Sequence, residues 1–299
     1  MKATAQSLPA LPLTDKGWVA VFADLVKARL TLLVLLTTLV GFYLGTRGAV
    51  DLALLFHTLL GTALVASGAA ALNELLEREH DARMRRTASR PLPSGRMHPI
   101  TVALLGTLFS VFGLLWLALA TQWVTCAVAG VSLATYLFIY TPLKRVTWLN
   151  TLIGAVPGGL PPLIGWTAAQ GGWTGGGWSL FAILACWQVP HFMAIAWLYR
   201  EEYAKAGFAM LPVEDVTGQR TARQAVGFSV LLLGASLLPY EFGLVGGAYF
   251  VGALTLGLGF AALAVWFAVE LTLPRARQLF LASIIYLPLL LGLMVVAKR

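Results

Sequence analysis

Cysteine is nearly absent from this 299-residue sequence, and charged residues are scarce at 11% of the chain. Cys126 and Cys186 both lie within apolar runs and form no CxxC pair, so the sequence predicts neither a disulfide framework nor a cysteine metal site. The first 23 residues lack an apolar core before a small-residue cleavage site, and they lack an arginine-rich amphipathic pattern. We therefore expect neither a signal peptide nor a transit peptide.

Long apolar runs fill most of the chain instead. Hydrophobic residues make up 59% of the sequence and the mean hydropathy is +0.80, which excludes an ordinary soluble domain. A helix needs about 20 predominantly apolar residues to cross a bilayer. We predict an all-α integral membrane protein with nine transmembrane helices, forming one membrane domain over residues 1–299. The nine runs are 30–46, 53–76, 99–120, 122–140, 148–169, 178–199, 225–240, 243–269 and 277–297.

The basic residues lie mainly on one side of the predicted spans. With a cytoplasmic N-terminal tail over residues 1–23, 18 of the 21 Lys and Arg residues fall in cytoplasmic segments. This asymmetry follows the positive-inside rule and accounts for the net charge of +8 without a nucleic-acid partner. It predicts a cytoplasmic N-terminus and a C-terminus on the outer side. We expect the membrane to be a prokaryotic cytoplasmic (inner) membrane.

Charge is most concentrated in the segment 71–96, directly after the second apolar run. If the second helix continues past Leu76, then Asn73, Glu77 and Asp81 follow at four-residue steps, each of which turns about 40° and rises about 6 Å. The three side chains would then share one face. Oxygen ligands of this kind suit Mg²⁺, which takes its other ligands from water and phosphate.

Several arginines follow this row and could bind phosphate oxygens. They are Arg85, Arg86, Arg90 and Arg96. The alternative is a juxtamembrane charge cluster that fixes topology and binds lipid headgroups. Polar residues inside the apolar run, Asn73 and Glu74, favour a functional site because a polar group there is costly.

A second candidate group ends the fourth apolar run. Tyr140 and Lys144 are four residues apart on either side of Pro142, and Arg145 follows. These side chains could complete a diphosphate clamp opposite a metal ion. Alone, they are more typical of basic side chains that extend to the membrane surface, and it is the carboxylates of the preceding segment that favour the clamp.

Prolines and one histidine distinguish the fifth and sixth runs. Pro157, Pro161 and Pro162 in the fifth run, and Pro190 in the sixth, should kink or break their helices. Such bends can surround a cavity, although proline is also common in membrane helices. His191 could bind a ligand or handle a proton, or it could hydrogen-bond a neighbouring helix.

These segments together resemble the UbiA superfamily of membrane prenyltransferases, and within it the branch that farnesylates protohaem. The resemblance covers nearly the whole chain. The matching stretches, in order, are RLTLLVLLTTLVG, NELLEREHDARMRRTASRPLPSGR, YTPLKR, NTLIGAVPGGLPPLIGW, WQVPHF and EEYAKAGFAMLPV. This sequence departs from the family pattern at Glu77, where the family usually has Asp, and at Ala28 and Ala209, where it commonly has Pro.

The resemblance implies nine helices around a central cavity that opens to the cytoplasm and to membrane lipid. It implies Mg²⁺-dependent transfer of a farnesyl group from farnesyl diphosphate to the 2-vinyl group of haem B. Addition of water would then give haem O. This reaction would be a step in the biosynthesis of haem O and haem A for terminal oxidases. Whether a downstream haem A synthase is a partner stays open.

The resemblance also implies residue roles. The metal ligands would be Asn73, Glu77 and Asp81; the diphosphate would meet Arg85, Arg86, Arg90, Tyr140, Lys144 and Arg145; and haem would meet His191, Glu202 and Tyr203. The metal ligands, Lys144 and Arg145 would be the catalytic residues.

Two other functions remain possible on this sequence. A related prenyltransferase could use a quinone precursor as its aromatic acceptor. A transporter or haem-handling scaffold would need charged residues in facing spans. Here the charges cluster at one face, and the second Asp-rich motif of the quinone-forming members is absent.

Overall fold

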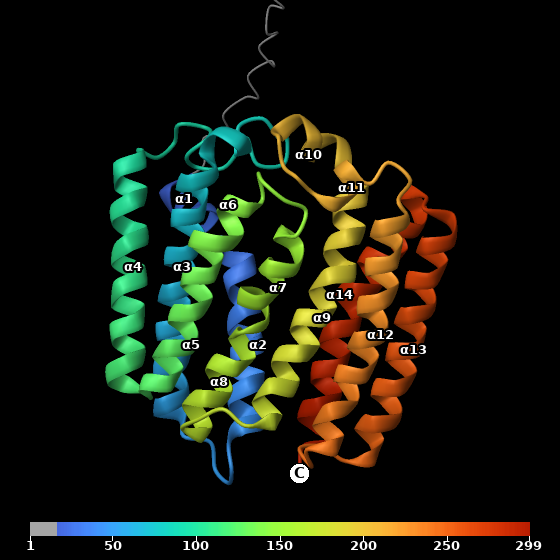
Figure 1. Cartoon of the computed structure of the whole chain (residues 1–299). Coiled ribbons are helices and arrows are strands. Elements are labelled where there is room, and N and C mark those ends of the chain that lie inside the picture. The colour runs from blue at the N-terminus through green and yellow to red at the C-terminus, as the bar shows by residue number, and fades with distance from the viewer. Residues whose placement is uncertain (1–16) are drawn as a thin grey trace, which may run out of the picture.

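Helices provide nearly all the regular structure of residues 17–299, the part of the chain that this computed structural model describes (Figure 1). Within these residues, nine segments are long and apolar enough to cross a membrane, as predicted. They are α2 (Ala28–Gly45), α3 (Leu52–Asp81), α4 (Pro99–Ala120), α5 with η1 and α6 (Trp123–Leu143), α7 with α8 (Asn150–Gln170), α9 (Gly175–Leu198), α12 (Gln219–Glu241), α13 (Gly247–Glu270) and α14 (Leu273–Val296).

Three short helices lie at one end of the bundle. They are α1 (Trp18–Leu25), α10 (Arg200–Ala206) and α11 (Leu211–Glu214). We call this end, with the connecting segments 82–98, 144–149 and 199–218, the charged end. The predicted tail therefore contains a helix from residue 18, and its residues 1–16 lie outside the described part of the chain. The C-terminal residue lies at the opposite end (Figure 1).

Helix α3 is the longest element and carries polar residues past the membrane. Asp51 caps its first turn, where the side chain accepts a hydrogen bond from Leu54 N at 2.9 Å. Its 30 residues span about 45 Å at 1.5 Å per residue, more than the hydrocarbon thickness of about 30 Å. The predicted continuation past Leu76 is thus confirmed, and the last turns stand at the charged end.

The helix of the fifth span is broken near its prolines, as predicted. The helix of the sixth span is not broken at its proline. Helix α7 (Asn150–Gly159) ends just before α8 (Pro161–Gln170), and Pro161 begins α8, where its missing N–H is no loss. Helix α9, by contrast, continues through Pro190 without a break.

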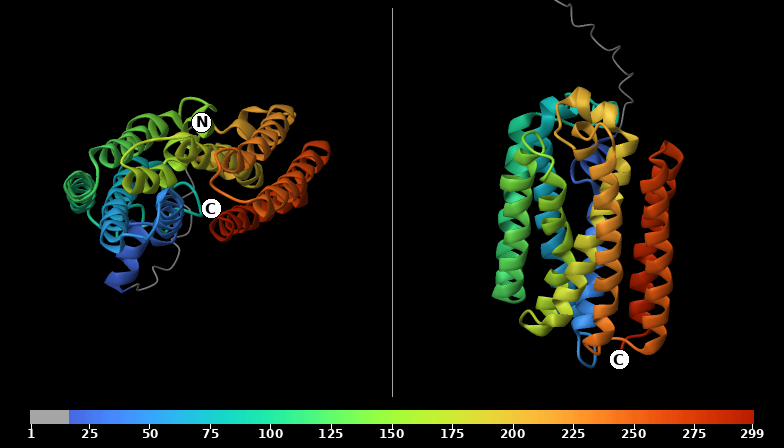
Figure 2. Two further views of the ribbon diagram at one scale, coloured as in Figure 1. Left: turned by 90° about the horizontal axis from the view of Figure 1, so that it is seen from below. Right: turned by 45° about the vertical axis from the view of Figure 1, so that its right-hand side comes forward.

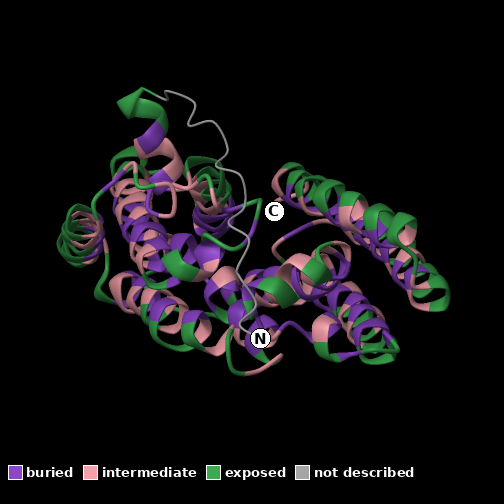
Figure 3. Ribbon diagram, turned by 90° about the horizontal axis from the view of Figure 1, so that it is seen from above, coloured by how far each residue is buried: buried purple, intermediate pink, exposed green. Residues whose placement is uncertain are grey.

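Helix α9 lies in the middle of the bundle, where it packs against α7, α8, α12 and α14. Seen along the helix axes, α4 lies at one margin and α13 at the other (Figure 2). Buried residues face inward and exposed ones outward (Figure 3). The outward faces are themselves apolar, as lipid contact requires; examples are Leu104, Phe112, Leu119, Val251 and Leu258.

The first and last spans are joined at the end opposite the charged end. The Lys298 ammonium donates to the carbonyl oxygens of Tyr43 at 2.5 Å and Thr46 at 2.8 Å. Both carbonyls lie at the C-terminal end of α2, where Tyr43 O otherwise accepts a 3.3 Å bond from Thr46 N, and a cation at this end is favoured by the helix dipole.

Helices α2 and α8 approach so closely that their contact points are glycines. A Cβ added at Gly41 would overlap the backbone oxygen of Pro162, and one at Gly165 would overlap the backbone oxygen of Thr38. Small residues of this kind allow close packing of membrane helices.

Replacing Gly41 with Ala should therefore lower the melting temperature of the protein in detergent, because backbone atoms cannot move aside as a side chain can. Overpacking of this kind costs about 1–3 kcal/mol. Gly259→Ala is the matched control, since a Cβ at this exposed α13 position would meet nothing within 4 Å. Equal melting temperatures for the two variants would contradict this account of the α2–α8 contact.

Candidate functional site

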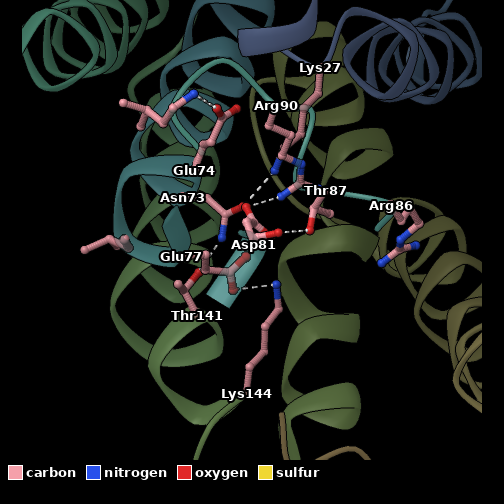
Figure 4. A network of polar contacts seen from close by, with 12 residues as sticks. Lys27, Asn73, Glu74, Glu77, Asp81, Arg86, Thr87, Arg90, Thr141 and Lys144 are labelled. Carbon is pink, nitrogen blue, oxygen red and sulfur yellow. Dashed lines mark hydrogen bonds and ion pairs between the residues drawn. The ribbon is translucent and has the colours of Figure 1, made fainter. Parts of the chain in front are cut away.

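Three side-chain groups from the end of α3 meet at the charged end of the bundle (Figure 4). Asn73, Glu77 and Asp81 are all buried, with exposed fractions of 1%, 3% and 1%. Their four-residue spacing places them on one face of a continuous helix. The structure therefore brings together the three residues that the sequence predicts as metal ligands.

Each of these groups contacts a different cation. The Lys27 ammonium donates to Asn73 Oδ1 at 2.7 Å, and the Lys144 ammonium lies 2.8 Å from Glu77 Oε1. The Arg90 guanidinium donates to Asp81 Oδ2 at 2.5 Å. We call these six residues the α3 cluster. Burial of charge at this density is tolerated because each carboxylate is paired.

The three cations come from separate parts of the chain. Lys27 lies between α1 and α2, Arg90 in the segment after α3, and Lys144 directly after α6 (Thr141–Leu143). Contacts over such distances in sequence fix how three segments converge on the end of one helix. The cluster therefore holds these segments together and is also the candidate site.

Two of these cations have perturbed acid–base properties. Burial, followed by the nearby Arg90 guanidinium, lowers the pKa of Lys27 to about 8. Burial also opposes the charge on Lys144, but interactions with Tyr140 and Glu77 outweigh it and raise the pKa of this lysine. Both cations are charged at neutral pH, Lys144 by the wider margin.

Lys27 was not among the residues predicted for the site. It has a backbone φ of 47°, in the left-handed region that non-glycine residues rarely adopt, and this turn aims the chain from α1 into α2. Strained residues of this kind concentrate at functional sites. Its sequence signal is a lysine three positions before the first apolar run, which begins at residue 30.

Asn73 is oriented by a second contact. Its Nδ2 donates to Thr141 Oγ1 at 3.1 Å, and this hydroxyl donates to the carbonyl of Tyr136 at 2.8 Å. With the amide N–H engaged there, Oδ1 faces Lys27. Thr141 follows η1 (Thr135–Tyr140), a π-helical segment of the kind often found at functional sites.

Only part of the diphosphate clamp predicted after the fourth span lies at the α3 cluster. The Lys144 ammonium lies 4.5 Å from the centre of the Tyr140 ring, so both residues are beside Glu77 as expected from their spacing. Arg145 instead donates to the carbonyl of Leu76 at 2.5 Å. Its partner is therefore a backbone carbonyl within α3 rather than a carboxylate.

The predicted arginines of the segment after α3 also lie in different places and do not share one partner. Arg90 is the one that reaches Asp81, whereas Arg85 is exposed. Arg86 points away from the cluster in Figure 4 and donates to the Tyr203 hydroxyl at 3.1 Å. Arg96 bonds to Ser94 and Ser89, and lies 3.8 Å from Asp24.

A hydrogen bond to the buried Glu74 side chain helps to hold the segment 82–98 against α3. The side chain is fully buried, and Oε1 accepts a hydrogen bond from Leu92 N at 2.8 Å. The Thr87 hydroxyl donates to the carbonyl of Asp81 at 2.8 Å. These two bonds tie the segment back against α3 and so position Arg90.

The predicted haem residues lie in two separate environments. His191 is half-buried on α9, where Nδ1 lies 2.7 Å from Ser283 Oγ of α14 and the ring stacks on Trp187 with centroids 4.7 Å apart. Glu202 and Tyr203 are on α10 at the charged end. The hydrogen bond to a neighbouring helix, one of the two roles considered for His191, is present.

The donor set of the α3 cluster fits a hard divalent cation. Among residues 17–299, no three Asp, Glu, His or Cys side chains converge as a metal centre. In the α3 cluster the third oxygen donor is the amide of Asn73. One amide oxygen and two carboxylates match the few protein ligands that Mg²⁺ takes when phosphate and water supply the rest.

Comparison with known proteins finds relatives that carry the same name. The sequence is 46% identical to a protoheme IX farnesyltransferase of Solibacter usitatus over 93% of this chain and 98% of that one. A protein of the same name from Salinibacter ruber is 43% identical over 91% of this chain and 96% of that one.

Solved structures share the fold at much lower identity. A digeranylgeranylglyceryl phosphate synthase has a TM-score of 0.80 at 17% identity, over 93% of this chain and 98% of that one. A UbiA homologue from Archaeoglobus fulgidus bound to DMAPP and Mg²⁺ has a TM-score of 0.66 at 16% identity, over 91% and 98%. The sequence matches the UbiA prenyltransferase family over residues 34–288. The chain therefore belongs to the UbiA prenyltransferase family.

Proposed function

We propose that this protein transfers the farnesyl group of farnesyl diphosphate to the 2-vinyl group of haem B, which gives haem O. The observation that carries the proposal is the α3 cluster: three buried oxygen donors and three cations at one end of the bundle. The relatives named protoheme IX farnesyltransferase support this choice of substrates.

The first step is departure of the diphosphate. The bond between the allylic carbon and oxygen breaks, and the electron pair leaves with the oxygen. Lys27, Arg90 and Lys144 then stabilise the negative charge that develops there, in a buried site where such interactions are strong. Asn73, Glu77 and Asp81 would hold a Mg²⁺ ion, which would supply Lewis-acid stabilisation of the same charge.

The second step joins farnesyl to the acceptor. The terminal vinyl carbon forms a bond to the allylic carbon, and the positive charge moves to the vinyl carbon next to the porphyrin. Water adds at that carbon and loses a proton, which leaves a hydroxyl group. The apolar interior limits earlier reaction of the allylic cation with water.

Haem is proposed to lie toward α9, α10 and α14. The aromatic rings of Trp187 and Phe280 flank His191, at centroid distances of 4.7 and 5.2 Å, and offer flat apolar contacts. Since Nδ1 of His191 faces Ser283, its other ring nitrogen is left to bind or orient the iron. We further propose that the charged end faces the cytoplasm, in a prokaryotic inner membrane.

The direct test of this function uses purified full-length protein in detergent with haem B, farnesyl diphosphate and Mg²⁺. We expect haem O by mass spectrometry and one diphosphate released for each farnesyl transferred. A parallel reaction contains 4-hydroxybenzoate in place of haem B. Prenylation of this acceptor without any haem O would contradict the proposal and favour a quinone precursor.

Asp81→Asn and Lys144→Ala should each lower kcat by about 100-fold, since removing one group that stabilises developing charge has an effect of that order. Both variants should stay inserted, as judged by gel filtration. Asp51→Asn is the matched control, because Asp51 caps the far end of α3 and Asn caps equally well. Rates at the level of the unaltered protein in both site variants would rule out the proposed clamp.

His191→Ala should reduce haem retention and change the haem absorption spectrum. Ser283→Ala separates the two roles of this histidine, because it removes the hydrogen bond and keeps the ring. His57→Ala, on α3 beside Trp116, serves as the control. If the His191→Ala spectrum is unchanged, or if Ser283→Ala reproduces the whole effect, His191 does not contact the iron.

A further inference from the structure

Three of the 21 Lys and Arg residues fall outside the predicted cytoplasmic segments, and all three line one cavity. They are Arg47, Lys298 and Arg299, which come from segments far apart in the sequence. The cavity has a volume of about 720 Å³ and lies opposite the charged end, where α2, α8 and α14 end and α9 begins (Figure 1). Basic residues are depleted on this side of membrane proteins, so their convergence indicates a site rather than scattered surface charge.

The lining of this cavity is positively charged and includes no Asp or Glu side chain. Lys298 donates to the carbonyls of Tyr43 and Thr46, which leaves one of its three ammonium hydrogens for another acceptor. The guanidinium groups of Arg47 and Arg299 have no hydrogen-bond or ion-pair partner among residues 17–299. The three cations and the α-carboxylate of Arg299 together leave two net positive charges. The cavity therefore favours an anion.

Trp166 adds a buried donor to the same cavity. This residue is 2% exposed and lines the cavity, and its Nε1–H has no hydrogen-bond partner within the described part of the chain. Buried polar groups nearly always have a partner, so an exception of this kind points to a bound ligand, ion or water. An indole N–H can only donate, and its ligand must therefore offer an acceptor.

The first turn of α9 lies beside this indole N–H. A Cβ added at Gly176 would overlap Cζ2 of the Trp166 ring, and one at Gly177 would overlap Cδ1. Nε1 belongs to the ring edge between these two atoms. The first N–H groups of a helix have no intrahelical acceptor, and Thr174, the N-cap of α9, makes no side-chain capping bond. Helix N-termini of this kind favour phosphate and other anions.

We propose that this cavity binds a phosphate group that carries net negative charge. Its oxygens accept hydrogen bonds from the guanidinium groups of Arg47 and Arg299 and from the indole of Trp166, a donor set that suits phosphate. Two sources of this group are the headgroup of an anionic phospholipid, whose chains could contact Leu44 and Leu244 of the lining, and inorganic phosphate. The site lies at the other end of the bundle from the α3 cluster and does not rest on the proposed farnesyl transfer.

The test uses the full chain, washed exhaustively in a maltoside detergent that contains no phosphate. The probes are dioleoylphosphatidylglycerol in mixed micelles and millimolar inorganic phosphate, and dioleoylphosphatidylcholine, which has no net charge, is the control lipid. Native mass spectrometry reports bound lipid. The indole resonance of Trp166 in a nitrogen–proton correlation spectrum, assigned by its loss in Trp166→Phe, reports contact inside the cavity. We expect phosphatidylglycerol or inorganic phosphate to shift this resonance, and phosphatidylcholine to leave it unchanged.

Arg47→Gln and Arg299→Gln should each weaken binding of the effective probe about fivefold, because a basic side chain beside an anionic headgroup contributes an interaction of that order. Both residues are exposed, so neither change should disturb folding. Arg223→Gln is the matched control: it removes the same charge from an exposed position near the start of α12, at the charged end, and should leave the affinity unchanged.

The two probes distinguish the sources of the phosphate group. A Trp166 shift with phosphatidylglycerol alone identifies a lipid headgroup, and a shift with inorganic phosphate identifies the free anion. The inference is overturned if neither probe shifts the Trp166 resonance, whatever lipid the mass spectra detect. It is also overturned if phosphatidylcholine shifts the resonance as strongly as phosphatidylglycerol, or if both arginine variants bind the effective probe as tightly as the unaltered protein.

Discussion

The pairing of three oxygen donors on α3 with three cations is the interaction on which the charged end of this protein depends. Charged groups this deeply buried must be paired, because an unpaired one would cost several kcal/mol. The pairs join residues that are 46, 67 and 9 positions apart, in the order Lys27–Asn73, Lys144–Glu77 and Arg90–Asp81. The need of each buried carboxylate for a cation, and of the buried Lys27 ammonium for an oxygen acceptor, therefore brings three separate segments to the end of α3.

Other features at this end serve the same arrangement. The length of α3 carries its last turns beyond the apolar region, and the left-handed turn at Lys27 directs the chain into α2. Thr141 orients Asn73, and the bond from Leu92 N to Glu74 holds the segment that carries Arg90. A small number of buried polar contacts thus sets a site within a bundle whose remaining stability comes from close apolar packing.

The sequence predicts the nine spans well, because about 20 apolar residues in a row have few structural alternatives. It also predicts the shared face of Asn73, Glu77 and Asp81, since helix geometry alone decides it. The sequence could not predict the contacts of Arg86 and Arg145, because the segments that carry these residues are not continuous helix. Lys27 was missed for a related reason: its partner lies in another helix, and no local pattern encodes that contact.

The central claim is that the oxygens of α3 bind a divalent cation together with diphosphate. Crystals or cryo-electron microscopy samples grown with Mn²⁺ and farnesyl diphosphate would place both ligands, and anomalous scattering from crystals identifies the metal. We predict a Mn²⁺ site bound by Asn73, Glu77 and Asp81 with a diphosphate oxygen among its other ligands. A metal bound elsewhere, with the three side chains still paired to Lys27, Lys144 and Arg90, would contradict the account.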